Sequence, residues 1–165
     1  MYYRDMKKKY VIGIVFAVLM VSLFYLKREN NTRALFSWRS EVISEEADEL
    51  IEFINDNKFN TLYQEFDLDD VESIQAFGNK TDIQLYHLCG SPDWDIERIK
   101  EEILAVYKVN QDITTNIKGL VVDIEPYLKA DWDKNKKKIM NSYIDDMIEA
   151  NEYAAKLGLE YFLCI

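Results

Sequence analysis

Two carboxylates, Asp123 and Glu125, carry the strongest chemical signal in the sequence. They stand two residues apart at the end of the apolar run 119–124 (GLVVDI), so on an extended strand both side chains project from the same face. Two neighbouring carboxylates push their pKa values apart, which allows one of them to stay protonated and to act as an acid near neutral pH. The alternative is a solvated strand end without chemistry of its own.

Aromatic and polar side chains at the ends of the predicted strands could complete a binding surface. Tyr127 and Trp132 follow the same strand as the two carboxylates, and their rings could serve as platforms for sugar rings. The other candidates follow three earlier strands: Trp38, Glu65, His87 and Trp94. In parallel α/β folds the carboxyl ends of the strands meet at one edge, where function gathers. The alternative for each tryptophan is a packing role. The alternative for His87 is a histidine of the core or its rim whose hydrogen bonds are made within the protein.

The composition excludes several other kinds of chemistry. One histidine and two cysteines give no zinc-ligand spacing, and Cys89 and Cys164 lie in apolar runs that favour buried free thiols over a disulfide. The chain has no glycine-rich phosphate loop and no G-x-S-x-G elbow, so we expect no nucleotide, no metal and no other cofactor. Residues 1–29 hold six of the 20 basic and two of the 30 acidic residues, which leaves 14 bases and 28 acids. Such an acidic surface repels nucleic acid.

Apolar strand-like runs alternate with helical stripes from residue 34 onwards. The runs predict five strands, at 34–38, 60–66, 82–88, 119–124 and 159–165. Between them, four stripes predict helices: one capped by Ser44, one over about 68–77, one capped by Asp95 and one ended by Gly158. Near-continuous apolar strands separated by helices imply an α/β fold with a parallel sheet.

Two architectures fit this order of elements. One is an open, doubly wound sheet. The other is the first half of a (β/α)₈ barrel, which needs about 250 residues in full. No helix follows the last predicted strand, whereas open sheets of this kind usually finish on one. The pattern therefore favours a partial barrel of five strands and four helices.

An uncharged apolar segment precedes this domain. Residues 10–26 (YVIGIVFAVLMVSLFYL) would rise about 25 Å as a helix, near the shortest length that spans a bilayer core. Basic residues at positions 4 and 7–9 predict a cytoplasmic N-terminus by the positive-inside rule. A cleaved signal peptide would have a shorter apolar region and a small-x-small site, and a buried core helix is the other alternative.

The predicted organisation therefore has four parts. They are a basic cytoplasmic N-terminus (1–9), a transmembrane signal anchor (10–26), a polar linker (27–33) and the α/β domain (34–165). We expect a single-pass protein of the cell membrane, with membrane lipid as a partner of residues 10–26 and the C-terminal domain outside the cytoplasm.

The segment 118–127 (KGLVVDIEPY) resembles the fourth strand of glycoside-hydrolase TIM barrels. It is similar to the Asp-Gly-x-Asp-x-Asp-x-Glu signature of family-18 chitinase-like proteins, with Gly119, Asp123 and Glu125 on the Gly, the last Asp and the Glu. The resemblance implies that Glu125 is the general acid that protonates the glycosidic oxygen. It also implies that Asp123 orients Glu125 and helps to steer the acetamido group of the substrate.

Three hypotheses follow for the function. The first is a membrane-anchored glycosidase-like barrel that hydrolyses a cell-wall or extracellular glycan. The second is a non-catalytic module that binds a saccharide or an envelope protein, which Lys118 and Val121 favour because they replace two Asp residues of the signature. The third is an anchored open α/β domain whose role the sequence does not indicate, or a fragment of a split or frameshifted gene. Most glycosidases need a second carboxylate, in many barrels from a late strand, so we expect the 165-residue chain alone to be inactive.

Overall fold

The computed structural model describes residues 32–114 and 116–164 of the chain. Its contacts divide the chain between Thr32 and Arg33, and all that follows concerns the second unit. The predicted N-terminus (1–9), anchor (10–26) and most of the linker lie outside the described residues. Within 32–114 and 116–164, no helix combines the length and the apolar character that a membrane span requires.

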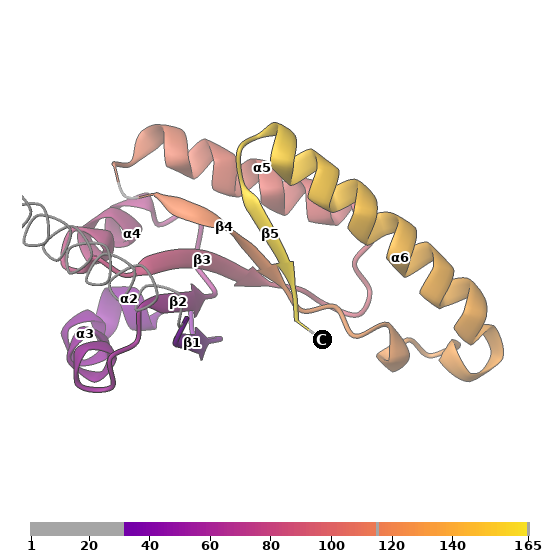
Figure 1. Cartoon of the computed structure of the whole chain (residues 1–165), viewed down its shortest axis with the longest axis horizontal. Coiled ribbons are helices and arrows are strands. Elements are labelled where there is room, and N and C mark those ends of the chain that lie inside the picture. The colour runs from indigo at the N-terminus through magenta and orange to yellow at the C-terminus, as the bar shows by residue number, and fades with distance from the viewer. Residues whose placement is uncertain (1–31, 115, 165) are drawn as a thin grey trace, which may run out of the picture. The chain divides into compact units, whose positions relative to one another are not determined.

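Five parallel strands form one sheet, and they are ordered in space as they are along the chain (Figure 1). The strands are β1 (Ala34–Ser37), β2 (Thr61–Gln64), β3 (Gln84–Cys89), β4 (Ile117–Val122) and β5 (Glu160–Leu163). Each overlaps its predicted run, so the α/β class with a parallel sheet is confirmed. A doubly wound sheet reverses its strand order at a switch point, and this sheet has no reversal. The order is consistent with a partial barrel.

The helices connect successive strands. They are α2 (Val42–Glu45), α3 (Ala47–Asp56), α4 (Val71–Gly78), α5 (Ile96–Asp112) and α6 (Trp132–Lys156), with a 3₁₀ turn η1 (Pro126–Leu128) before α6. The predicted cap at Asp95 is confirmed, because its carboxylate accepts the Arg98 N–H at 3.0 Å. The predicted cap at Ser44 is wrong. Ser44 lies inside α2, where its hydroxyl donates to the Glu41 carbonyl at 2.9 Å and so caps no amide.

Side chains alternate between the two faces of the sheet, and the helices cover only one of them (Figure 1). On the covered face, strand residues such as Leu62, Leu120 and Val122 share one core with helix residues such as Ile103 and Ala150. A separate cluster on the other face contains strand residues alone: Tyr63, Tyr86, Leu88 and Val121. Right-handed crossovers that always step in the same direction place every helix on the same side. In a closed barrel the uncovered face would line the interior.

Aromatic rings interlock across the uncovered face. Phe36 contacts Tyr63 with a centroid distance of 4.7 Å, and Tyr63 contacts Tyr86 at 5.6 Å. Tyr86 in turn contacts Phe162 of β5 at 5.6 Å, and all three contacts are edge-to-face, the geometry that aromatic quadrupoles favour. The two outer rings belong to the edge strands and stay exposed, Phe36 by 48% and Phe162 by 45%. The uncovered face is thus apolar and open to solvent at both edges of the described sheet.

Candidate functional site

The two candidate acids follow β4 instead of lying on it. The strand ends at Val122, but the backbone continues its ladder for one more step, because the Asp123 N–H donates to the Cys89 carbonyl at 2.8 Å. Ile124 belongs to the covered core, and both Ile124 and Pro126 line a cavity on the helix side. Alternation along this extended segment puts the side chains of Asp123 and Glu125 on the opposite side. The expected strand placement is therefore corrected, while the two acids still share a side.

Burial and mutual repulsion change the proton affinity of this pair. Partial burial raises the pKa of Asp123, and the charge of Glu125 raises it further. Tyr127 is brought to the same place, since its hydroxyl donates a hydrogen bond to Oε1 of Glu125. That bond, together with burial and the Glu125 charge, raises the pKa of the Tyr127 phenol. Asp123 therefore keeps its proton to higher pH than an isolated aspartic acid would.

Gly90 determines where Asp123 can lie. It adopts φ +145°, and a Cβ at this position would come within 2.2 Å of the Asp123 carbonyl oxygen. Only a residue without a side chain allows the loop after β3 to pass so close to the backbone after β4. The sequence indicates Gly90 as part of a turn, but the contact with Asp123 joins segments more than 30 residues apart and leaves no local signal.

A surface groove of about 470 Å³ collects most of the other candidates. Its lining includes Trp38, Glu65, His87 and Trp94, together with Gly90, Arg98 and Glu102. Gly90, which lies close to the Asp123 backbone, also lines the groove, but the side chains of Asp123, Glu125 and Tyr127 do not. Sequence reasoning missed Arg98, whose guanidinium lies over the Trp94 ring at 5.0 Å from its centroid. Trp38 keeps 46% of its surface exposed.

His87 lines the groove, and both of its ring nitrogens interact with other residues. Its Nδ1 accepts the Phe66 N–H at 3.3 Å, and its Nε2 lies 3.4 Å from Oε2 of Glu102. The hydrogen bond from His87 lowers the pKa of Glu102, and the Arg98 charge acts in the same direction against the effect of burial. Because the side chain is buried and both nitrogens are engaged, His87 supports the site without offering a contact to a ligand.

Trp132 is the candidate that the structure separates from the rest. It begins α6, where the Lys136 ammonium lies over its ring at 5.4 Å, and it is not part of the groove lining. Cys89 and Cys164 are free thiols, and burial raises the pKa of both. In the described part of the chain, no group of three or more His, Cys, Asp and Glu side chains could hold a metal ion.

The fold and the site define an α/β protein with a singly wound parallel sheet and a carboxylate pair at the carboxyl end of its fourth strand. No family model, no curated protein and no solved structure matches the chain. The resemblance of residues 118–127 to family-18 chitinase-like proteins therefore depends on those residues alone and stays a prediction.

Proposed function

We propose that this protein is a membrane-anchored, extracytoplasmic glycoside-hydrolase-like protein whose glycan site comprises Asp123, Glu125, Tyr127 and the adjoining groove. The observation that carries the proposal is the cluster of Asp123, Glu125 and Tyr127 at the carboxyl end of β4, with a groove lined by two tryptophans next to it across the Gly90 backbone. Catalytic groups of parallel barrels gather at this end of the strands. The resemblance at residues 118–127 supports the same assignment.

In this proposal Glu125 is the general acid. It donates a proton to the glycosidic oxygen while the bond from that oxygen to the anomeric carbon breaks. Water then adds to the anomeric carbon and returns a proton to the Glu125 carboxylate. Asp123 orients Glu125, and burial and the Glu125 charge raise the pKa of Asp123 itself. The Tyr127 hydroxyl fixes one oxygen of Glu125. By the resemblance, Asp123 also helps to steer an acetamido group.

The groove supplies the sugar platform. The Arg98 guanidinium lies over one face of the Trp94 ring, whereas the Trp38 side chain has a large exposed surface. Trp38 is therefore the tryptophan we expect to stack on a sugar ring. Glu65 lines the same groove and can accept hydrogen bonds from sugar hydroxyls.

The anchor and the orientation belong to the same proposal. Residues 10–26 tether the domain in the lipid bilayer with the N-terminus in the cytoplasm, and the glycan is a cell-wall or extracellular one. Protease treatment of intact cells tests this arrangement. Cleavage of the C-terminal domain is expected, and its full protection would contradict the extracytoplasmic location.

A non-catalytic saccharide-binding or envelope-protein-binding module is the second candidate. Lys118 and Val121 replace two acids of the resembled signature, and Val121 is buried in the apolar cluster of the uncovered face. The polar surroundings that would tune a general acid are correspondingly reduced. Binding without turnover is the expected behaviour of such a module.

Glycan binding by the full chain in detergent tests both candidates. Chitin oligosaccharides and peptidoglycan fragments are the probes, measured by calorimetry, and Trp38→Ala should weaken binding about tenfold, whereas the Trp132→Ala control should not. Hydrolysis of the same glycan probes is measured in a second assay. There Glu125→Gln should lower the rate about 100-fold or more, with exposed Glu152→Gln as the control.

The outcomes separate the two candidates. If glycan binding survives Glu125→Gln and the protein hydrolyses none of the probes, the protein is the non-catalytic saccharide-binding module. A hydrolysis rate unchanged by Glu125→Gln removes the general acid. The absence of binding to every glycan probe contradicts the glycosidase and the saccharide-binding module, and it leaves only the envelope-protein-binding module.

A further inference from the structure

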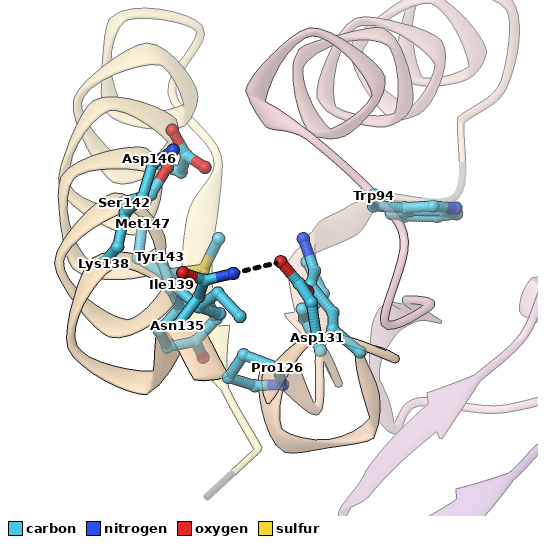
Figure 2. Close-up of a pocket in the computed structure, with 12 residues that line it drawn as sticks. Trp94, Pro126, Asp131, Asn135, Lys138, Ile139, Ser142, Tyr143, Asp146 and Met147 are labelled. Atoms are coloured by element: carbon cyan, nitrogen blue, oxygen red, sulfur yellow. Dashed lines mark hydrogen bonds between the residues drawn. The ribbon is translucent and has the colours of Figure 1, made fainter. Parts of the chain in front are cut away.

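A second cavity, which shares Trp94 with the groove and no other lining residue, lies between the β4–α6 loop and α6 (Figure 2). Its volume is about 170 Å³, and its lining comprises Trp94, Ile124, Pro126, Lys129, Asp131, Asn135, Lys138, Ile139, Ser142, Tyr143, Asp146 and Met147. The helical geometry of α6 breaks at Asn135 (φ −125°, ψ 15°), so the first turn is set apart from the rest of the helix. The Asn135 amide donates to Oδ2 of Asp131 at 2.9 Å, which ties this turn to the helix across the cavity mouth (Figure 2).

The floor of this cavity is apolar and well supported. Ile124 and Met147 are buried in the main core, and Pro126 is buried beside them. The Met147 sulfur also accepts a hydrogen bond from the Tyr161 hydroxyl at 3.3 Å, which fixes its position. An apolar cavity of roughly 150 Å³ holds a molecule the size of benzene, so the space suits a small branched aliphatic group.

Charges of both signs line the same space. Lys138, Ser142 and Asp146 are spaced four residues apart along one side of α6, and their side chains lie together at the cavity (Figure 2). Lys129 reaches the cavity from the loop. In the described ranges, the side chains of Lys129, Lys138 and Asp146 make no hydrogen bond and no ion pair with one another or with other residues.

The Asp146 carboxylate has no cationic partner within ion-pair distance among the described residues. Burial raises the pKa of its carboxyl and the Glu149 charge raises it further, while the Lys129 charge lowers it. A ligand cation would stabilise this carboxylate, because a partly buried charge gains most from a close, hydrogen-bonded partner. A ligand anion would do the same for the two lysines.

We propose that this cavity binds a small zwitterion with an aliphatic body, namely a free α-amino acid with a branched side chain. The ligand ammonium group meets Asp146, and the ligand carboxylate meets Lys129 and Lys138. The side chain packs on Ile124, Pro126 and Met147. Glu125 does not line this cavity, so the inference is independent of the proposed glycan chemistry.

Calorimetry on the full chain in detergent tests the inference, with L-leucine as the probe. Leucinamide, which lacks the carboxylate, and 4-methylpentanoate, which lacks the ammonium group, should each bind about tenfold more weakly than leucine. Asp146→Asn should weaken leucine binding about tenfold, and Lys138→Gln about fivefold. Asp145→Asn is the matched control, because Asp145 is an exposed neighbour on α6 outside the cavity lining.

Each result decides the matter. Thermal unfolding of every variant confirms that it is folded, and Asp146→Glu offers a second variant that keeps the charge and should retain most of the affinity. No heat of leucine binding at concentrations up to about 10 mM would overturn the inference. Equal binding of leucine and its two analogues would also overturn it, since the charges would then be irrelevant.

Discussion

The Tyr86 hydroxyl donates a hydrogen bond to Oε2 of Glu160 at 2.9 Å, across the strand that separates them. Tyr86 of β3 and Glu160 of β5 both pair with Gly119 of β4, one on each side. Because Gly119 has no side chain, the phenol ring passes over β4 and reaches β5. Side chains as well as backbone ladders therefore hold the uncovered face of the sheet together.

Removing the Tyr86 hydroxyl should weaken the fold modestly. We expect Tyr86→Phe to lower the free energy of unfolding by about 1 kcal/mol, because one hydrogen bond to a charged acceptor is lost while the ring contacts remain. Urea denaturation measures the change. Tyr63→Phe is the control, since Tyr63 shares the aromatic row and its hydroxyl has no hydrogen-bond partner among the described residues. Equal losses in the two variants would show that the Tyr86–Glu160 bond adds nothing.

Adding a side chain at Gly119 should cost more. A Cβ there would lie 1.9 Å from the Glu160 carbonyl oxygen, and that oxygen belongs to the backbone of β5, which cannot move freely. We expect Gly119→Ala to lower the free energy of unfolding by about 2 kcal/mol or more. Gly158→Ala provides the comparison, because no atom lies within 4 Å and only its φ of +75° opposes the change. A cost for Gly119→Ala no larger than that for Gly158→Ala, which we place at about 1 kcal/mol, would contradict this account.

The partly buried Glu102 should make stability depend on pH. The hydrogen bond from His87 lowers the pKa of Glu102 in the folded state. A carboxyl with a lowered pKa stabilises the fold above its unfolded value of about 4.3, and this contribution disappears as pH falls through the folded value. We expect Glu102→Gln to cost about 2 kcal/mol at pH 7 and progressively less below about pH 4.

Denaturation curves between about pH 3 and pH 7 measure this loss, within the range where carboxyls titrate. Glu101→Gln is the matched control, because exposed Glu101 also pairs with Arg98, at 3.1 Å. Such surface pairs contribute at most about 1 kcal/mol. A Glu102→Gln loss that does not change with pH would point to packing instead of charge.

Asp123 should behave in the opposite way. Burial and the Glu125 charge raise its pKa, so the folded state binds a proton more tightly than the unfolded chain. The stabilising contribution is then complete below the unfolded value of about 3.9 and is lost as pH rises through the folded value. We expect Asp123→Asn to be more stable than the natural chain at pH 7 and not at about pH 3. Asp145→Asn serves as an exposed control, and a loss of stability at pH 7 would contradict the raised pKa.

Much of the fold could be predicted from the sequence because periodicity is local. Apolar runs such as 82–88 and 119–124 overlap β3 and β4, and Asp95 caps α5 as expected. The predicted ends of the helices and strands were less accurate, since these ends depend on contacts with residues distant in the sequence. Ser44 has the chemistry of an N-cap, but it lies inside the short helix α2, where its hydroxyl donates to the Glu41 carbonyl.

Less of the candidate site could be predicted. The spacing of Asp123 and Glu125 indicates a shared side, because alternation is a property of any extended backbone. The neighbours of the site residues are distant in the sequence. Gly90 contacts the Asp123 backbone from the loop after β3, and His87 interacts with the Phe66 N–H and the Glu102 carboxylate. No pattern within a short window reveals such contacts.

By itself, the sequence determined which segments are strands, which are helices, and which side of each is apolar, because side-chain polarity and spacing act within a few residues. Only the tertiary structure decided the order of the strands, the covering of one face of the sheet by helices, and the cavity between the β4–α6 loop and α6. These features depend on the direction of each crossover and on backbone approaches such as that of Gly90 to Asp123, where segments distant in the chain must fit together in space.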